Sequence, residues 1–339
     1  MSWGVIRCPA YLGERFRAYS RLPLLKRLPQ VVQDAKDYLK ARCRYAPAAA
    51  EGKQLAEAVK GMLRITRLPD LYKDFYAWLG RPELLRPLRG SVLEYADVFP
   101  LVYLKMRLEG VAPYGAVKHL VVDEMQDYTP VQYAVLARLF PGKKTILGDA
   151  SQAVNPYGAT TADDIARVFP RAEIVRLNKS YRSTCEITAF AGRILPNPDL
   201  VAVERHGPEP AVRGFETTAA ELDAIREMLH AFRASGRKSL GIICKTEGQA
   251  AALHGQLQPP GGVRLLTEHS TTFAGGILVT TAALAKGLEF DEVIVPFATA
   301  GNYQTSLDRS TLYVACTRAM HRLSLTHTGP ATAFRSPVD

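Results

Sequence analysis

The sequence predicts an α/β protein whose strands form parallel sheets, preceded by a helical segment. Three observations lead to this fold class. From residue 119 onward, apolar stretches of strand length alternate with longer stretches of helical spacing. Before residue 80, apolar residues recur mainly at helical spacing. Most polar motifs fall at the carboxyl ends of the predicted strands, which is where the ligands of parallel sheets bind.

The first elements along the chain are helices. Over residues 11–80 apolar side chains recur three or four positions apart, as in Leu24 and Leu28. The alanine-rich stretch at residues 47–50 is expected to join two of these helices. Two prolines then end the pattern, and residues 92–108 predict a further helix around an internal proline.

Strands and helices then alternate toward the end of the chain. Thr129-Pro130 is typical of a helix start, with threonine as the N-cap and proline at the first helical position. The predicted strands cover residues 119–122, 144–149, 172–177, 240–244, 263–266, 276–281, 292–296 and 323–326. The predicted helices cover residues 219–234, 248–257 and 310–319, with one more after Tyr181. This alternation favours parallel sheets with helices on both faces.

The charge of the chain is concentrated near its N-terminus. The net charge is +10; residues 1–90 hold 18 Lys and Arg against 8 Asp and Glu, whereas residues 91–339 hold 25 of each. A concentrated basic segment favours an anionic partner, either nucleic-acid phosphates or an acidic protein surface. The alternative is a solvated helical face, because exposed helices often carry basic residues.

The composition is that of a globular protein. Hydrophobic residues make up 47% and charged residues 22% of the 339 residues, and this length allows two domains. No apolar run approaches the roughly 18 residues of a membrane span, and the N-terminus has no signal-peptide layout. The five scattered cysteines are expected to be reduced thiols. We therefore expect a cytoplasmic protein without a membrane partner.

The most informative stretch is Asp123-Glu124-Met125-Gln126-Asp127, which follows an apolar strand. At the carboxyl end of a buried strand, the first carboxylate can hold Mg²⁺ and the second can orient or deprotonate a hydrolytic water. The alternative is a pair of acidic residues near a helix N-terminus, where the helix dipole stabilises them.

Four further stretches add polar groups downstream. Gln152 follows a strand and can sense a terminal phosphate, and Tyr181-Arg182 can stack a base and contact a phosphate. Residues 279–281 lead into Ala285-Lys286-Gly287-Leu288-Glu289-Phe290-Asp291, and Arg318 is expected on a helix, where it could act as a finger on a phosphoryl group.

In order and spacing, these stretches resemble motifs II to VI of superfamily 1 helicases of the UvrD/Rep class. The resemblance covers residues 118–320 and implies RecA-like domains that bind ATP and Mg²⁺. It implies a basic helical segment at 1–90 as the tail of an inserted arm. A partial first RecA-like domain would follow at 91–178 with motifs II and III. A complete second one would lie at 179–339 with motifs IV, V and VI.

The resemblance also implies catalytic roles. Asp123 would hold Mg²⁺, and Glu124 would activate the hydrolytic water. Gln152 would contact the γ-phosphate, and Arg182 and Arg318 would neutralise the charge of the transition state.

Four other residues would bind nucleotide or polymer. Tyr181 would stack on the adenine, Glu289 would meet the ribose, and Gly287 would allow close approach of the backbone. Thr281 would contact nucleic acid. Structural alternatives remain: Tyr181 could pack on the following helix, and Gly287 could serve only a tight turn. Arg318 likewise could form contacts within its own domain.

Within the superfamily, the chain looks most similar to HelD-type proteins, which use ATP to release bacterial RNA polymerase from nucleic acid. The similarity lies in Tyr95-Ala96-Asp97, residues 101–105, Asp123 to Tyr133, Gln152 to Tyr157, and Leu284 to Asp291. It implies RNA polymerase as a partner beside or in place of DNA.

The sequence departs from the helicase pattern in three places. It contains no Gly-x-x-x-x-Gly-Lys-Ser/Thr phosphate loop, although such a loop would cradle the β- and γ-phosphates. Ala283 stands where translocating helicases usually have a histidine, and Tyr157 is the one aromatic left where motif III usually continues into base-stacking residues. We expect the C-terminal portion of a longer motor. The alternatives are a DNA helicase of the repair type and a non-catalytic module that binds a partner.

Overall fold

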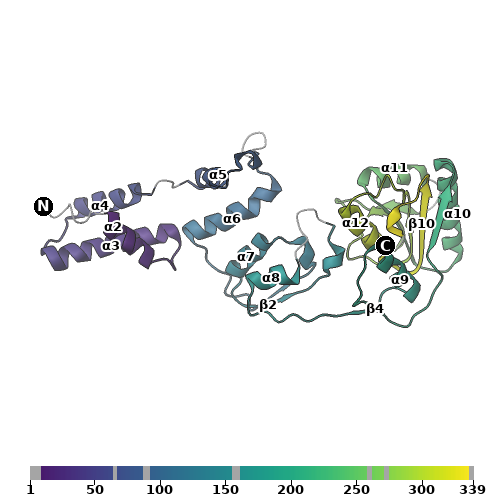
Figure 1. Cartoon of the computed structure of the whole chain (residues 1–339), viewed down its shortest axis with the longest axis horizontal. Helices are drawn as coiled ribbons and strands as arrows, with labels where there is room; N and C mark the ends of the chain where they lie inside the picture. The colour runs from purple at the N-terminus through teal and green to yellow at the C-terminus, as the bar shows by residue number, and fades with distance from the viewer. Residues whose placement is uncertain are drawn as a thin grey trace. The chain divides into compact units, whose positions relative to one another are not determined.

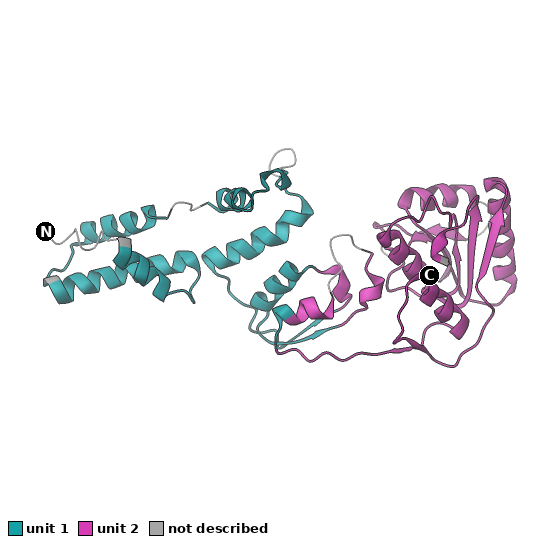
Figure 2. Cartoon of the chain, viewed as in Figure 1, with its two compact units in different colours: residues 1–122, 129–146, 167–170 teal, residues 123–128, 147–166, 171–339 magenta. Residues whose placement is uncertain are grey.

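The computed structural model describes residues 9–63, 67–86, 92–154, 161–257, 262–270 and 275–335. The chain divides into two compact units (Figure 2). The first unit contains residues 1–122, 129–146 and 167–170, and the second contains residues 123–128, 147–166 and 171–339. The division of the chain into three segments at residues 90 and 178 stays a prediction. None of the helices described is both long and apolar enough to cross a membrane.

The first unit begins with three helices that share an apolar core, as predicted. They are α2 (Pro9–Ala18), α3 (Leu24–Cys43) and α4 (Ala49–Gly61) (Figure 1). α3 and α4 are joined by a short turn at the predicted alanine-rich stretch. Their buried side chains recur at helical spacing and form one cluster, which consists of Leu12, Val31, Val32, Ala35, Leu39, Leu55 and Val59.

Two further helices are tied together by a buried carboxylate. The helices are α5 (Leu68–Trp78) and α6 (Tyr95–Glu109), with the short helix η1 (Pro82–Leu84) between them. Asp97 is 4% exposed, and its Oδ1 accepts hydrogen bonds from the hydroxyls of Tyr72 at 2.7 Å and Tyr76 at 3.2 Å. A buried carboxylate needs such donors, so these bonds fix α5 against α6.

A two-stranded parallel sheet completes the first unit. β1 (His119–Val122) pairs in register with β2 (Lys143–Ile146), and α7 (Pro130–Leu139) is the crossover. The predicted cap is confirmed: Thr129 Oγ1 accepts from Gln132 N at 3.3 Å, and Gln132 Oε1 accepts from Thr129 N at 2.6 Å. This reciprocal capping box starts α7 immediately after motif II.

The strand predicted at residues 172–177 is wrong. This segment has no regular structure, and α8 (Ala162–Val168) precedes it. The short strands β3 (Lys179–Ser180) and β4 (Val201–Ala202) pair beyond it. The apolar residues that suggested a strand are instead exposed, Val175 at 72% and Leu177 at 87%. Apolar composition favours a strand only where a neighbour is available for pairing.

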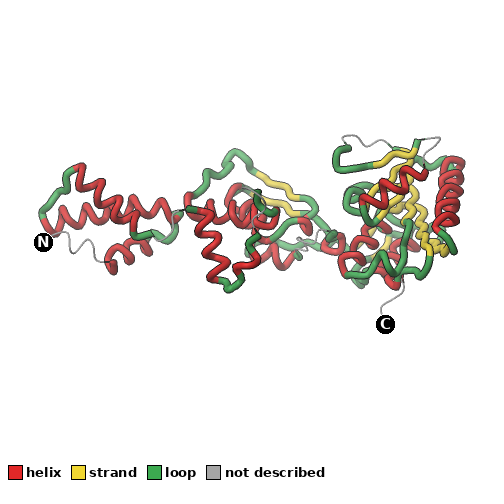
Figure 3. Tube along the Cα trace, turned by 90° about the horizontal axis from the view of Figure 1, so that it is seen from above, coloured by secondary structure: helices red, strands yellow, loops and turns green. Residues whose placement is uncertain are grey.

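The second unit contains a six-stranded, fully parallel sheet in the order β5-β10-β9-β6-β8-β7. Figure 1 labels β10 of this sheet, and Figure 3 draws strands in yellow. The elements of the second unit are β5 (Ala211–Phe215), β6 (Ser239–Cys244), β7 (Val263–Leu265), β8 (Gly276–Thr281), β9 (Phe290–Val295), β10 (Ala319–Thr328), α9 (Cys185–Ile194), α10 (Thr218–Ala234), α11 (Glu247–Leu257) and α12 (Ser306–Cys316). Three short helices accompany them: η2 (Met125–Asp127), η3 (Ala150–Gln152) and η4 (Ala333–Arg335).

Helices cover both faces of this sheet, as predicted. Successive strand residues point to opposite faces, so Ile242 joins the core beneath α10 and α11, whereas Ile243 joins the core beneath α9 and α12. On β8, Ile277 likewise joins the core beneath α10 and α11, and Leu278 joins the core beneath α9 and α12. Continuous apolar strands are therefore required here, because both faces are buried.

The helix predicted at residues 310–319 begins and ends earlier. Thr305 caps α12 by accepting a bond from Asp308 N at 3.1 Å, and the helix ends at Cys316. The expectation that Arg318 lies on a helix is therefore wrong. Arg318 lies in the short turn before β10, where the chain passes from α12 into the sheet.

Candidate nucleotide-binding site

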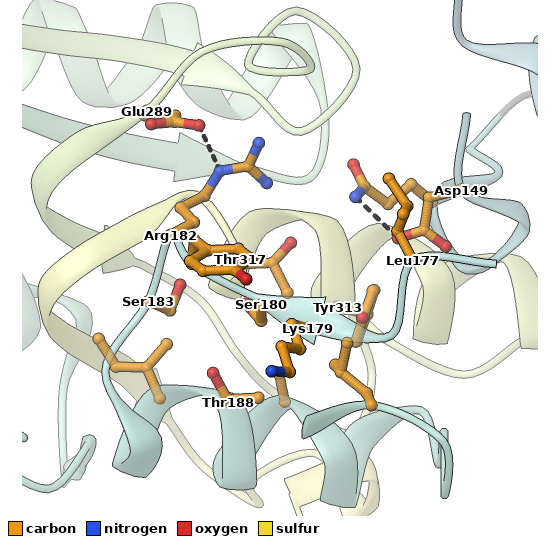
Figure 4. A pocket seen from close by; sticks show the side chains of 15 residues that line it. Asp149, Leu177, Lys179, Ser180, Arg182, Ser183, Thr188, Glu289, Tyr313 and Thr317 are labelled. Carbon is orange, nitrogen blue, oxygen red and sulfur yellow. Dashed lines mark hydrogen bonds and ion pairs between the residues drawn. The ribbon is translucent and has the colours of Figure 1, made fainter. Parts of the chain in front are cut away.

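A cavity of about 450 Å³ lies in the second unit (Figure 4). The loop before α9, the α9 helix, η3 and the C-terminal end of α12 provide its walls. One part of the lining is apolar, with Ile187, Ala191 and Leu200. The other is polar, with Asp149, Gln152, Lys179, Arg182, Glu289 and Thr317. Tyr181 also lines the cavity. Four residues that were selected from the sequence therefore line one cavity: Gln152, Tyr181, Arg182 and Glu289.

Arg182 is held at the rim of this cavity by a carboxylate. Its Nε donates to Glu289 Oε1 at 2.5 Å, a contact visible in Figure 4. Its backbone is fixed as well, because the Arg205 guanidinium donates to the carbonyls of Arg182 and Met320. The hydroxyl of Ser183 also donates to Ala319 O at 2.6 Å. Motif IV is thus anchored to the start of β10.

Arg318 is a buried cation, only 1% exposed. Its Nη2 donates to Gln152 Oε1 at 2.6 Å, and its Nε donates to Val314 O at 3.2 Å. Burial lowers the pKa of Arg318 to about 10, and repulsion from Arg182 adds to the lowering. The side chain therefore stays charged at neutral pH, but its environment favours the arrival of a negative charge.

Gln152 is oriented from both ends of its amide. The oxygen accepts from Arg318, and Nε2 donates to Asp149 Oδ2 at 3.0 Å. Asp149 in turn caps η3, because its Oδ1 accepts from Ser151 N at 2.9 Å. The predicted phosphate sensor is thus preorganised in contact with the predicted arginine finger.

A buried glutamine, for which the sequence predicted no role, joins motifs II and III. Gln126 is fully buried; its Nε2 donates to Glu124 Oε2 at 2.7 Å, and its Oε1 accepts from Asp149 N at 3.1 Å. A Cβ at Gly148 would lie 2.5 Å from Gln126 Oε1, so only glycine allows this approach. The sequence did contain a signal for this residue, because Gln126 lies within the stretch Asp123-Glu124-Met125-Gln126-Asp127.

Lys286 is a second residue whose role was not predicted. Its side chain is 8% exposed, and Nζ lies 2.7 Å from Asp127 Oδ2 and 3.4 Å from Glu124 Oε2. It therefore places one positive charge between two of the three carboxylates of motif II, those of Glu124 and Asp127. Glu124 itself has left-handed backbone angles, φ 53° and ψ 52°, which are uncommon for a residue with a side chain.

Three predicted residues lie apart from this network. Thr281 is 5% exposed and its Oγ1 accepts from Leu284 N at 3.4 Å, a bond within the turn after β8. Gly287 has φ +79° in the same loop, where a side chain would be strained although space is free. Tyr181 is 71% exposed, so most of its side chain is accessible. Tyr157 lies outside the described residues.

Among the residues that the structure describes, the side chains do not form a metal cage. In the described part of the chain, no three His, Cys, Asp or Glu residues are grouped as metal ligands. Asp123 is exposed, and its Oδ1 accepts from Glu124 N at 2.8 Å. Mg²⁺ commonly takes only one or two carboxylates together with substrate phosphates. Asp123 therefore fits Mg²⁺ that arrives with a nucleotide.

Comparisons with known proteins agree with the motifs. Residues 276–326 match the UvrD-like helicase C-terminal domain. The chain is 29% identical over 159 residues to ATP-dependent DNA helicase UvrD2 of Mycobacterium tuberculosis strain H37Rv (42% of this chain, 22% of that protein). It is 36% identical over 84 residues to DNA helicase II of Escherichia coli K12 (23% of this chain, 12% of that protein). The chain thus spans less than a quarter of the length of these relatives.

Among solved structures, the C-terminal domain of a possible DNA helicase from Lactobacillus plantarum WCFS1 is 37% identical, with a TM-score of 0.41. The match covers 47% of this chain and 94% of that one. The family match and the curated relatives agree with the motif order found in the sequence. The C-terminal part of this chain is therefore similar to the C-terminal portion of superfamily 1, UvrD-like helicases.

Proposed function

We propose that the second unit supplies the phosphate-responsive half of an ATP site in a superfamily 1 motor. The observation that carries the proposal is the pairing of Arg318 with Gln152 beside the cavity lined by Arg182 and Glu289. Arg182 and the oriented amide of Gln152 line the cavity, and the buried guanidinium of Arg318 is bonded to that amide. Such groups can bind a phosphoryl group and stabilise the charge of its transition state.

The hydrogen bonds suggest how phosphate binding would reach the hydrolytic residue. A γ-phosphate that attracts Arg318 would compete with Gln152 for its guanidinium. Gln152 is bonded to Asp149, and Asp149 is linked through Gln126 to Glu124. A change at the phosphate would therefore reach Glu124 from Arg318 through four hydrogen bonds.

In the proposed reaction, Glu124 accepts a proton from a water that attacks the γ-phosphorus. The new oxygen–phosphorus bond forms as the bond to the β-phosphate oxygen breaks, and ADP leaves with the electron pair. Arg182 and Arg318 offset the charge that develops. Mg²⁺, held through Asp123, would neutralise charge on the phosphate oxygens.

The remaining residues are assigned to binding of the nucleoside part of ATP and of the nucleic acid. We assign Tyr181 to stacking on the adenine and Glu289 to the ribose. Gly287 would permit close backbone approach, and Thr281 would contact the nucleic-acid strand. The exposure of Tyr181 supports this role, because a largely exposed aromatic ring is available for stacking on a base.

DNA is the polymer that the relatives favour, because both curated relatives are named as DNA helicases. The test is ATP turnover by this chain with Mg²⁺, with and without single-stranded DNA, beside a Glu124→Gln variant. Because the sequence contains no phosphate loop, we expect this chain alone to be inactive; where a phosphate loop is supplied, we expect turnover that DNA stimulates and that Glu124→Gln abolishes. Turnover that persists in the variant would contradict the role of Glu124.

A finer proposal is that the motor is of the HelD type and remodels RNA polymerase–nucleic acid complexes. It is supported by the sequence stretches around Asp97, Asp127 and Lys286, and by Ala283 in place of the usual histidine. The test is binding to bacterial RNA polymerase with and without ATP. We expect binding that ATP weakens, and an ATP-independent complex would exclude the HelD-type role.

A non-catalytic partner-binding module is the remaining candidate, since the sequence contains no phosphate loop. It predicts partner binding that neither Glu124→Gln nor Arg318→Ala alters. The ordered network around Gln152 favours the motor instead, because a pure docking module does not require it.

A further inference from the structure

We propose that the α3–α4 turn binds nucleic-acid phosphates, as a surface separate from the motor site. Residues 9–63, which form α2, α3 and α4, carry 11 Lys and Arg against 5 Asp and Glu, a net charge of +6. None of these residues belongs to the stretch that matches the helicase domain. This inference therefore stands or falls independently of ATP hydrolysis.

Five basic residues gather at this turn, and we call them the basic turn. Lys36, Lys40 and Arg42 lie in the C-terminal half of α3, Arg44 caps it, and Lys53 lies near the start of α4. Arg44 has φ 49° and its N–H bonds to Leu39 O, so it turns the chain sharply. Lys36 reaches across to α4, since its Nζ lies 3.2 Å from the position of a Cβ on Gly52.

The acidic residues nearby are largely occupied by neighbouring donors. Glu51 accepts from Tyr45 Oη at 2.6 Å and from Ala48 N at 2.8 Å. Asp34 accepts from Tyr19 Oη at 2.9 Å, and Asp37 from Gln33 at 3.0 Å.

Ion pairs do not neutralise the basic turn either. Within the described residues 9–63, the ion pair found is Glu14 with Arg15 at 3.8 Å, which is away from the turn. Apart from the half-buried Lys36, the basic side chains of the turn are exposed. Their charges are therefore available to an external anion.

The chemistry of the surface favours nucleic acid over an acidic protein. Within the described part of residues 23–61, no large hydrophobic side chain is exposed. Protein interfaces generally have an apolar centre, whereas nucleic-acid interfaces are polar and strongly positive. Lys and Arg around a tight turn suit contact with the phosphate backbone without reading its sequence.

The test is equilibrium binding of a fluorescein-labelled DNA duplex to the full chain over a range of salt concentrations. The variant is Lys40→Gln/Arg42→Gln/Arg44→Gln. Each lost phosphate contact reduces the slope of log affinity against log salt by about 0.9, so the slope should fall by about 2 to 3. At low salt we expect the affinity to fall about tenfold or more.

The matched control is Arg213→Gln/Arg226→Gln/Lys238→Gln, which removes the same charge from exposed sites of the second unit. It should leave the slope nearly unchanged, and circular dichroism should show both variants folded. Equal losses in the two triple variants would overturn the proposal, because net charge alone would then explain them. Poly-glutamate is the second probe: loss of poly-glutamate binding with intact DNA binding would assign the surface to an acidic protein.

Discussion

At the scale of single residues, the arginine that lines the cavity and the buried arginine beside it each have an internal partner. Arg182 is balanced by the carboxylate of Glu289, and Arg318 is held by the neutral amide of Gln152. The second arrangement leaves a buried positive charge without a carboxylate bonded to it. A phosphate would satisfy Arg318 better than an amide does, because hydrogen bonds between ionised groups are stronger.

Lys286 is expected to hold the motif II carboxylates together. Lys286→Met should lower the free energy of unfolding by about 1–3 kcal/mol, since Glu124 and Asp127 would lose their shared cation. Both carboxylates are about one-third exposed, so solvent should keep the loss near the lower limit. Urea unfolding measures it. Lys286→Arg is the control and should retain most of the stability, and equal losses in both variants would contradict the ion-pair role.

Sequence reasoning found the residues of the cavity better than the residues that support them. Gln152, Tyr181, Arg182 and Glu289 were selected from motifs, and all four line the cavity. Gln126 was quoted without a role, because its importance depends on burial beside Gly148, and spacing along the chain does not reveal burial.

At the scale of elements, one glycine permits the close packing of the central strand of the large sheet. A Cβ at Gly241 on β6 would lie 2.7 Å from the ring of Phe290, which is fully buried on β9. Gly241→Ala should therefore destabilise the fold by about 1–3 kcal/mol through overpacking. Gly255→Ala on exposed α11 meets no atom within 4 Å and should stabilise by about 0.5–1 kcal/mol. Chemical denaturation compares the stabilities of the two variants. If Gly241→Ala left the stability unchanged, this close packing would be refuted.

A second prediction concerns the contact between α9 and the loop before β5. The bond between His206 Nδ1 and Glu186 Oε1, 2.7 Å long, raises the pKa of His206 above its ordinary 6.5 and lowers that of Glu186 to about 2. The His206 contribution is complete below pH 6.5 and is lost as pH rises through the raised pKa. The Glu186 contribution is present above pH 4.5 and is lost as pH falls toward 2.

The pair should thus stabilise most between pH 4.5 and 6.5. Thermal unfolding of His206→Gln should show a deficit in mildly acidic buffer that shrinks in alkaline buffer. His230→Gln, at an exposed position on α10, is the control for replacing a histidine by glutamine. A pH-independent deficit for His206→Gln would mean that packing, and not charge, explains it.

Elements were predictable where one local pattern determines them. The cap at Thr129 and the buried strand β8 were found because capping residues and continuous apolar runs are local signals. The strand expected at residues 172–177 was not formed, because pairing depends on a neighbour elsewhere in the chain. Arg318 was placed on a helix for the same reason: the end of α12 depends on where β10 enters the sheet.

At the scale of the whole molecule, the excess of positive charge and the helicase-like motifs lie in different parts of the chain. The excess of basic residues lies within residues 1–90, whereas the remaining residues are electrically balanced and contain the motifs. This separation fits a chain in which one surface holds an anionic partner while another responds to nucleotide. It also allows each role to be removed without altering the other.

The most direct test of the proposed phosphate response is the affinity of the chain for ATP and for ADP in the presence of Mg²⁺. We predict that ATP binds more tightly by about 1.5–3 kcal/mol, the range for hydrogen bonds to charged groups, and that Arg318→Gln removes this difference. Arg182→Gln should reduce it as well, and unfolding curves would confirm that both variants are folded. Equal affinity for the two nucleotides, or a difference that survives in Arg318→Gln, would contradict the account.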